Sequence, residues 1–478
     1  MKKILLLLLV LTLVVSCKSL RKGKTGKPGE RGEVVTSHKN QNWISERPIG
    51  MVPIPGGAFV LGQSDMDFNA TEVKALQTTV TISSFYMDDT EVTNAEYRQF
   101  INYVRDSIVR TLLAEKAGTE SSGKGKGEGI GDYAYRSKKS EKEQSAYQKF
   151  LEEKGGRDGY DNVGKELDWS VPLEWNPERY PDVAYAEAIE SVYYTPEERF
   201  NGERVIDGRK LVYKFSWLDQ LEAIRKKGRG KGLIKTEAIA IYPDTTVWLR
   251  DFNYSYNEPL FEQYFWHKAF KNYPIVGVTW NQARAFCAYS TKNKNDWNQS
   301  RKKKKDKVFE YRLPTEVEWE YAARGGLENA PYPWGGPYLI DDRGCYLANF
   351  KPKRGDYIED HEKANYMYTA PVRSFHKNGF GLYEMAGNVS EWTGSAFNNS
   401  SYTIASTMNP YLGNRIEDAR KVIKGGSWKD IGYMLMVGER DWEHKDSARS
   451  YIGFRRVQSI PEGLKVKYPQ IKKYNKGN

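Results

Sequence analysis

Cysteine and histidine are scarce in this sequence. The chain has only 3 Cys in 478 residues, which excludes a fold held together by many disulfides, and no two cysteines form a CxxC pair for zinc or redox chemistry. None of its 5 His lies four residues from another, so the helical zinc motif HExxH is also absent. The common sequence patterns of zinc enzymes and dithiol oxidoreductases are therefore excluded.

Long apolar runs are equally rare, and the one that exists lies at the N-terminus. Residues 4–15 are almost entirely apolar and follow two lysines, but they are too few for a bilayer-spanning helix, which needs about 20 residues. The run ends just before Cys17 and resembles a bacterial lipoprotein signal, in which residues 1–16 are removed and Cys17 is acylated. The alternative is an ordinary secretory signal that contains a cysteine by chance. Because no acidic cluster follows Cys17, we expect a lipid-anchored protein of the outer membrane that faces the periplasm.

Charge is abundant but has little local bias. Lys and Arg exceed Asp and Glu by 11, yet the excess is spread over the chain, and the basic stretches at 225–231 and 301–305 are typical of solvated loops. We therefore expect no nucleic-acid partner. The 39% hydrophobic and 13% aromatic residues allow a sizeable core, and the length allows roughly two to four domains.

Changes in composition predict how the chain is divided. A glycine-rich basic tether at 17–48 follows the signal, and a basic tail occupies 459–478. Between them, 49–109 and 273–458 carry several glycine- and tryptophan-containing motifs, whereas 110–272 contains low-complexity sequence and many Trp and Tyr residues. We interpret 110–272 as a large aromatic-rich insertion into a domain formed by the other two segments.

Three predicted helix starts share one pattern. Thr93, Thr279 and Thr315 are each followed three residues later by Glu or Gln. This is the capping box, in which the two side chains satisfy each other's backbone amides. Elsewhere the strands and helices that the sequence predicts are short and irregularly spaced. The pattern favours an α+β fold with few regular elements over alternating βαβ units.

Several motifs occur in one order along 49–109 and 273–458. They are 53–57 (PIPGG), 89–94 (DTEVTN), 312–320 (RLPTEVEWE), 332–335 (YPWG), 381–392 (GLYEMAGNVSEW), 425–428 (GGSW) and 453–455 (GFR). Together they resemble the formylglycine-generating enzymes, also called sulfatase-modifying factors. The resemblance implies a compact, irregular α+β domain similar to C-type-lectin-like folds.

The chemistry of that family is the oxidation of a substrate cysteine to formylglycine by two cysteines that bind copper, just after the Gly-Gly-Ser-aromatic motif. In this sequence Asp430 and Leu435 stand at those two positions. Copper(I) is soft and needs thiolate ligands, so the resemblance implies neither copper nor this catalysis here. A second interpretation is a modifying enzyme with an altered site around Ser427, and a third is a lectin-like binding module.

The resemblance also implies that the structural disulfides of the family are lost. Arg456 stands where the partner of Cys287 is expected, and Ala323 replaces another family cysteine. Because Cys287 falls on the apolar face of a predicted helix, we predict a buried free thiol. A Cys287–Cys345 bridge is the alternative, since sequence alone does not test its geometry.

Family members also bind calcium through oxygen ligands, the coordination that this hard cation prefers. One matching set of residues is Glu384, Met385, Gly387 and Val389. A second set keeps Asn349 and Phe350, but Ala364 occupies the place of its expected Asp. The resemblance thus implies a calcium site at the Glu384 turn, and a turn held by hydrogen bonds alone is the alternative.

The lipoprotein signal and further motifs narrow the resemblance to the GldK/PorK lipoproteins of the type IX protein secretion system. These motifs are 243–248 (PDTTVW), 264–267 (YFWH) and 426–430 (GSWKD). The resemblance implies a non-catalytic scaffold that forms a periplasmic ring by self-association and with a GldN/PorN-like protein, beneath the outer membrane, in support of secretion and gliding motility. The sister GldJ lipoproteins share the fold and are the alternative.

Overall fold

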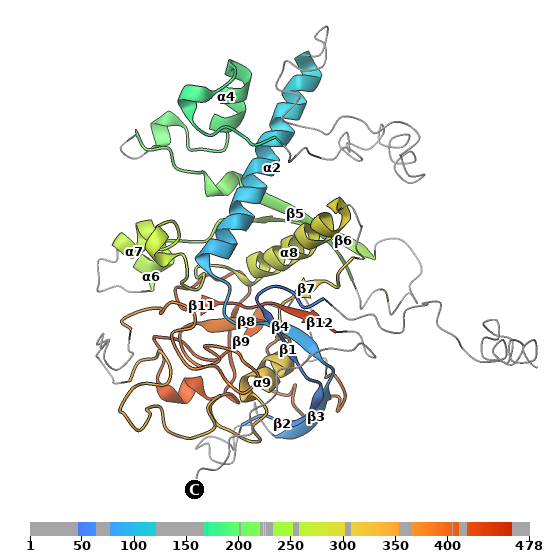
Figure 1. Ribbon diagram of the computed structural model, residues 1–478, viewed down its shortest axis with the longest axis vertical. Helices are drawn as coiled ribbons and strands as arrows, with labels where there is room; N and C mark the ends of the chain where they lie inside the picture. The colour runs from blue at the N-terminus through green and yellow to red at the C-terminus, as the bar shows by residue number, and fades with distance from the viewer. Residues whose placement is uncertain are drawn as a thin grey trace, which may run out of the picture. The chain divides into compact units, whose positions relative to one another are not determined.

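The computed structural model describes residues 46–63, 77–120, 171–199, 202–219, 233–251, 258–301, 307–352, 366–403, 405–410 and 418–460, together with Leu167, Trp169, Ala223 and Arg225 (Figure 1). The predicted signal, Cys17, most of the tether and nearly all of the tail lie outside the described residues. Contacts divide the chain into two units, Met1–Glu46 with Gly463–Val466 and Arg47–Glu462 with Lys467–Asn478. Every described residue except Glu46 belongs to the second unit.

The strands of this unit are β1 (Met51–Ile54), β2 (Gly57–Leu61), β3 (Thr78–Ile82), β4 (Phe85–Asp88), β5 (Val212–Leu218), β6 (Ile234–Ala240), β7 (Tyr311–Arg312), β8 (Ser390–Ala396), β9 (Arg420–Lys424), β10 (Asp441–His444), β11 (Ile452–Gly453) and β12 (Val457–Ser459). The α-helices are α2 (Asn94–Glu120), α4 (Val183–Glu190), α6 (Val247–Arg250), α7 (Glu258–Gln263), α8 (Trp280–Ser300) and α9 (Glu316–Arg324). Short 3-10 helices are η4 (Pro177–Arg179), η5 (Pro196–Glu198), η7 (Gly208–Lys210), η8 (Lys268–Phe270) and η10 (Gly432–Leu435).

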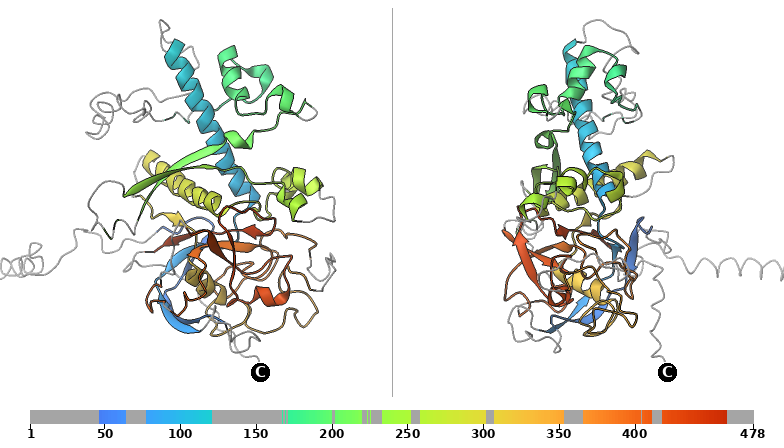
Figure 2. Two further views of the ribbon diagram at one scale, coloured as in Figure 1. Left: turned by 180° about the vertical axis from the view of Figure 1, so that it is seen from behind. Right: turned by 90° about the vertical axis from the view of Figure 1, so that its left-hand side faces the viewer.

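Two four-stranded sheets contain most of these strands. In the first, the order is β1-β4-β12-β7 and all neighbours are antiparallel. In the second, the order is β10-β9-β8-β11, and β11 runs parallel to β8. The mixture of short strands and helices confirms the predicted α+β class (Figure 2). Because β4 pairs with β12, the two motif-bearing parts of the chain form one fold.

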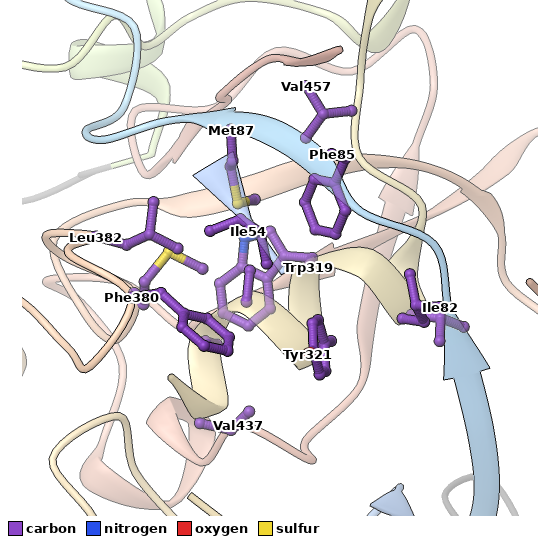
Figure 3. Packing of buried hydrophobic residues seen from close by; sticks show 14 of the residues in the cluster. Ile54, Ile82, Phe85, Met87, Trp319, Tyr321, Phe380, Leu382, Val437 and Val457 are labelled. Carbon is purple, nitrogen blue, oxygen red and sulfur yellow. The ribbon is translucent and has the colours of Figure 1, made fainter. Parts of the chain in front are cut away.

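A hydrophobic core lies where α9 packs against β1, β3, β4 and the loop around 380–385 (Figure 3). Trp319 of α9 and Met87 of β4 are both 0% exposed. Ala323, which stands in place of a family cysteine, is also fully buried in this cluster. Its small side chain therefore serves the packing of α9.

All three predicted capping boxes are present. The Thr93 amide donates to Glu96 Oε2 at 2.8 Å, and the Glu96 amide donates to Thr93 Oγ1 at 3.3 Å. Thr279 and Thr315 begin α8 and α9 in the same reciprocal manner. The helix α9 ends at Gly325, whose φ of 61° is the left-handed conformation that glycine adopts with little strain.

The aromatic-rich segment 110–272 begins inside α2, which continues as one helix to Glu120. The second half of α2 packs against α4, and Leu113 and Tyr185 belong to a separate hydrophobic cluster between them. Farther along, Trp248 of α6 stacks beside Trp428 with ring centroids 6.3 Å apart, so this part of the segment shares a core with the C-terminal motifs. Within the described residues, no helix combines the length and the apolar character that crossing a bilayer requires.

We predict that Met87→Ala lowers the free energy of unfolding by about 2–5 kcal/mol, because it leaves a cavity where a side chain was fully buried. The matched control is Met367→Ala, since that side chain is 41% exposed and its loss should change stability by less than about 0.5 kcal/mol. Urea unfolding followed by tryptophan fluorescence measures both. Equal effects of the two substitutions would contradict this assignment of the core.

Candidate functional site

The Gly425-Gly426 turn holds the candidate catalytic segment against the core. The two glycines have φ values of +95° and +64°, and a Cβ on Gly426 would lie 2.7 Å from the carbonyl oxygen of Met434. A Cβ on Gly425 would lie 3.1 Å from the ring of Trp319. Glycine is therefore required at both positions, and the chain after them packs closely against η10 and α9.

The two positions that would carry copper-binding cysteines hold groups of different character. Asp430 Oδ2 accepts a hydrogen bond from Ser427 Oγ at 2.6 Å, and Asp430 Oδ1 lies 3.1 Å from Lys429 Nζ. Leu435 is fully buried and packs in an apolar cluster with Phe350. One position thus closes a polar turn and the other belongs to the core, and neither offers a thiolate to a metal.

Ser427, the centre of the altered-site interpretation, is held as part of that turn. Its side chain is 0% exposed, and its hydroxyl donates to the Asp430 carboxylate. The Asp430 amide donates back to the Ser427 carbonyl oxygen at 3.0 Å. A nucleophile must be reachable as well as activated, and burial keeps a substrate away from this hydroxyl. The geometry favours a structural role for Ser427.

Arg455, the last residue of the GFR motif, lies in a buried charge cluster. Its Nη2 and Nε donate to Glu391 Oε1 and Oε2 at 2.6 and 2.7 Å. The indole Nε1 of Trp319 donates to the same Oε2 at 2.7 Å. Nearby, Asn388 Nδ2 donates to Glu91 Oε1 at 2.9 Å. These charged and polar motif residues therefore make structural contacts inside the fold.

The predicted calcium residue Glu384 already has hydrogen-bond donors. Its two carboxylate oxygens accept backbone amides of Arg373 at 3.0 Å and Phe375 at 3.2 Å. Burial raises the pKa of Glu384 to about 7. Burial and the neighbouring Glu384 carboxylate also raise the pKa of Glu91 well above its usual range. The two amide donors act in the opposite direction and lower the pKa of Glu384, because they favour its charged form. Both oxygens of this carboxyl group therefore already have partners within the turn.

The structure brings the two predicted calcium sets together. The carbonyl oxygen of Asn349 accepts the Asn388 amide at 2.8 Å, and a Cβ on Gly387 would lie 2.4 Å from that oxygen. The Asn349 side chain donates to the Tyr368 carbonyl oxygen at 2.6 Å. Both the backbone carbonyl group and the side chain of Asn349 therefore have hydrogen-bond partners. Among the described residues, no cluster of three or more His, Cys, Asp or Glu side chains is suited to a metal, and Ala364 lies outside them.

Some members of the predicted calcium set have partners within the protein. The set comprises Glu384, Met385, Gly387, Val389, Asn349 and Phe350. Its one carboxylate and the Asn349 amide group both have protein partners, and Phe350 lies in an apolar cluster. Calcium binding at these residues stays a prediction.

Cys287 is a buried free thiol, as predicted, and no disulfide joins it to Cys345. Burial raises the pKa of the Cys287 thiol to about 12, so it is protonated and unreactive at neutral pH. In place of a disulfide partner, Arg456 donates to Asp88 Oδ2 and Oδ1 at 2.8 and 3.0 Å and to Ser290 Oγ at 2.9 Å. An ion pair therefore joins β4 to the start of β12, beside α8.

A second buried charge network was not predicted from the sequence. On α9, Glu316 pairs with Arg440, and Glu320 lies 3.1 Å from Lys424 Nζ. Tyr402 donates its hydroxyl to Glu316 Oε1 at 2.9 Å. Glu320 also pairs with Arg324, four residues further along α9, at 2.8 Å. Two glutamates four residues apart on a short helix normally face solvent, and here Arg440 and Lys424 are 124 and 104 residues away in the chain. Local spacing indicates Arg324 as a partner, but it does not indicate Arg440 or Lys424.

A family model for the sulfatase-modifying factor enzyme 1-like domain matches residues 41–460. Among similar proteins, the formylglycine-generating enzyme of Bos taurus is 25% identical over 458 residues, which cover 93% of this chain and 86% of the enzyme. The inactive C-alpha-formylglycine-generating enzyme 2 of Bos taurus is 34% identical over 189 residues, 38% of this chain and about half (49%) of that protein. Among solved structures, PvdO from Pseudomonas aeruginosa gives a TM-score of 0.41 at 17% identity, covering 86% of this chain and 94% of that chain.

We predict that stability decreases as the pH rises from about 4.5 to about 7, in part through Glu384. A carboxyl group whose folded pKa of about 7 exceeds its ordinary value of 4.5 stabilises the fold fully below 4.5, and this contribution is lost as the pH rises through 7. At about 1.4 kcal/mol per pKa unit the loss is roughly 3 kcal/mol.

Glu384→Gln should reduce this pH dependence, because an amide is uncharged at every pH in the range. The exposed Glu178→Gln is the matched control and should leave it intact. Urea unfolding at several pH values in metal-free buffer measures the free energy of unfolding. If Glu384→Gln keeps the slope of the unmodified chain, the buried environment assigned to this carboxyl group is wrong.

Proposed function

This chain belongs to the sulfatase-modifying factor enzyme 1-like family, and we propose that it is a member without catalytic activity that works as a structural lipoprotein. The proposal rests on the residues found at the two positions where the family has copper-binding cysteines. Asp430 is bound to Ser427 and Leu435 is buried in the core, so the thiolates that the chemistry needs are replaced by groups with structural contacts.

The names of the similar proteins do not show whether this chain is active or inactive as an enzyme. They include proteins named formylglycine-generating enzyme and proteins named inactive C-alpha-formylglycine-generating enzyme 2. The decision therefore rests on the residues of this chain. The altered-site alternative would need Ser427 or another group to act as the nucleophile. Because Ser427 is buried, a substrate cannot reach its hydroxyl, which argues against Ser427 in that role.

The more specific proposal is a scaffold of the type IX secretion system of the GldK/PorK kind, with a GldJ-like lipoprotein as the alternative. The motifs near 243–248, 264–267 and 426–430 support it, as does the N-terminal signal that ends before Cys17. In this proposal the lipid on Cys17 fixes the chain to the periplasmic face of the outer membrane, and copies form a ring with a GldN/PorN-like protein. A closed ring requires each subunit to present two different contact faces.

We predict no formylglycine-generating activity. Purified protein, incubated with copper, oxygen and a peptide that carries the sulfatase cysteine motif, should leave the peptide mass unchanged. A formylglycine-generating enzyme in the same buffer is the positive control. Conversion of the cysteine to an aldehyde that depends on this protein, and is lost in Ser427→Ala, would establish the altered-site alternative instead.

We predict that Cys17→Ala abolishes labelling by a clickable fatty acid and releases the protein from membranes, because one acylated cysteine is the proposed anchor. Cys345→Ala is the matched control, since it also removes a thiol and should leave labelling intact. The same strains test the role in secretion. Deleting the gene should stop export of type IX substrates, and the Cys345→Ala copy but not the Cys17→Ala copy should restore it.

Native sizing after gentle detergent extraction completes this test. The unmodified chain should migrate in an assembly much larger than one subunit, and cross-linking should capture a soluble periplasmic partner within it. Normal secretion in the deletion strain, together with a monomer that has no partner, would contradict the scaffold proposal.

A further inference from the structure

The hairpin β5–β6 presents open strand edges. It forms a two-stranded sheet, and among the described residues no third strand pairs with it. The Asp219 amide donates to the Leu233 carbonyl oxygen and the Ile241 amide donates to that of Leu211, which fixes the hydrogen-bonded pairs of the ladder. Because these pairs alternate along an antiparallel ladder, residues 212, 214, 216 and 218 of β5 direct their amide and carbonyl groups outward.

The outer edge of β5 borders a groove. This groove has a volume of about 800 Å³, and its lining includes every residue from 213 to 218 but only Thr236 of β6. Its other boundaries are α8, through residues such as Ala288 and Thr291, and the chain segment 310–313 that contains β7. Figures 1 and 2 show α8 between the hairpin and β7. The groove therefore runs along an unpaired strand edge, with a helix as its floor.

The inner face of the hairpin packs against α2 and α8. The outer edge of β5 is therefore held in one conformation before any ligand binds. Tyr213 and Phe215 are buried beneath the hairpin, and Tyr213 packs edge-on against Phe100 of α2 at a centroid distance of 5.1 Å. Arg284 of α8 lies beside the Trp217 ring at 5.5 Å and pairs with Glu237 of β6 at 3.1 Å. These contacts hold β5 in place on the helix, which limits the conformational entropy that a ligand would have to remove.

Lys214 on the open edge indicates the charge of the occupant. Three other cations line the groove, and each pairs with a carboxylate of the chain: Arg284 with Glu237, Lys292 with Asp296 and Arg312 with Glu318. A lysine in the middle of an open edge discourages pairing with an identical strand, because the like charges would meet. The same lysine favours a strand that carries Asp or Glu.

We infer that this groove binds an extended, acidic segment of a protein partner, which adds a strand to the outer edge of β5. Recognition by strand addition takes its affinity from backbone hydrogen bonds and its specificity from alternate side chains. Here the amide and carbonyl groups of Lys214 and Ser216 supply the hydrogen bonds, and the Lys214 side chain on the same edge favours acidic side chains. The site is remote in sequence from Asp430 and Leu435 and holds whether or not the chain serves in secretion.

Three end-blocked, fluorescent eight-residue peptides test the inference on the purified full chain by fluorescence anisotropy. One alternates valine and glutamate, the second alternates valine and lysine, and the third is the acidic peptide with its amide nitrogens methylated. The acidic peptide should bind at least tenfold more tightly than the other two, because only it has both the charge and the hydrogen-bond donors. Equal binding of the methylated peptide, or no binding of the acidic one, would overturn the inference.

Two matched proline variants locate the site. Ser216 and Thr236 lie opposite each other and share a hydroxyl hydrogen bond of 2.9 Å, so Ser216→Pro and Thr236→Pro lose the same contact. Each also removes one outward amide, on the β5 edge and the β6 edge respectively, where proline is tolerated. Ser216→Pro should weaken binding of the acidic peptide at least tenfold and Thr236→Pro less than twofold.

The remaining outcomes are equally decisive. Equal loss in both proline variants would place binding elsewhere and overturn the inference. If sedimentation shows that the chain dimerises and that Ser216→Pro alone separates the dimer, the occupant is a second copy and the acidic-partner inference is wrong. If Ser216→Pro does not fold, the comparison of the three peptides on the unmodified chain still decides the matter.

Discussion

The buried guanidinium of Arg455 is the interaction on which the rest of the fold depends. It lies between β11 and β12, holds Glu391 on β8, and donates to the carbonyl oxygens of Asp88 and Tyr383 at 3.3 and 3.0 Å. Through Glu391 it also reaches Trp319 on α9. One cation thus connects both sheets, a helix and the loop that leads to β8. Because a buried charge that loses its partner costs about 3–5 kcal/mol, these segments are restricted to one arrangement.

This dependence explains why the chain keeps the motifs of its family although the two copper positions differ. The GFR motif and the glycine pair before Ser427 serve the packing of the fold, so they are required with or without catalysis. The positions held by Asp430 and Leu435 follow that framework, and here they carry a turn hydrogen bond and a core side chain in place of two thiols. Motifs of this kind therefore identify the fold, whereas activity must be argued from the individual residues of the site.

Local features were predictable from the sequence, and long-range partners were not. The capping boxes at Thr93, Thr279 and Thr315 depend on residues three positions apart, so the sequence displays both partners. The pairing of Glu316 with Arg440 joins residues 124 positions apart, and only the folded chain brings them together. The burial of Cys287 followed from its place on a helix face, but the ion pair of Arg456 with Asp88 beside it did not. The aromatic residues of 110–272 indicated an insertion but not where it packs, and Trp248 of this segment lies in one hydrophobic cluster with Trp428.

The strand order of the first sheet also has a mechanical consequence. Strand β1, the first element after the tether, is an edge strand whose only partner in the sheet is β4, whereas β12 is flanked by β4 and β7. A load applied to the N-terminal side of the unit is therefore carried by the single ladder between β1 and β4, which spans four residue pairs. A load applied after Ile460 is shared by two ladders. If the chain before Arg47 is pulled while the rest of the unit is held, the β1–β4 ladder is loaded first, and β4, β12 and β7 can stay paired when it opens.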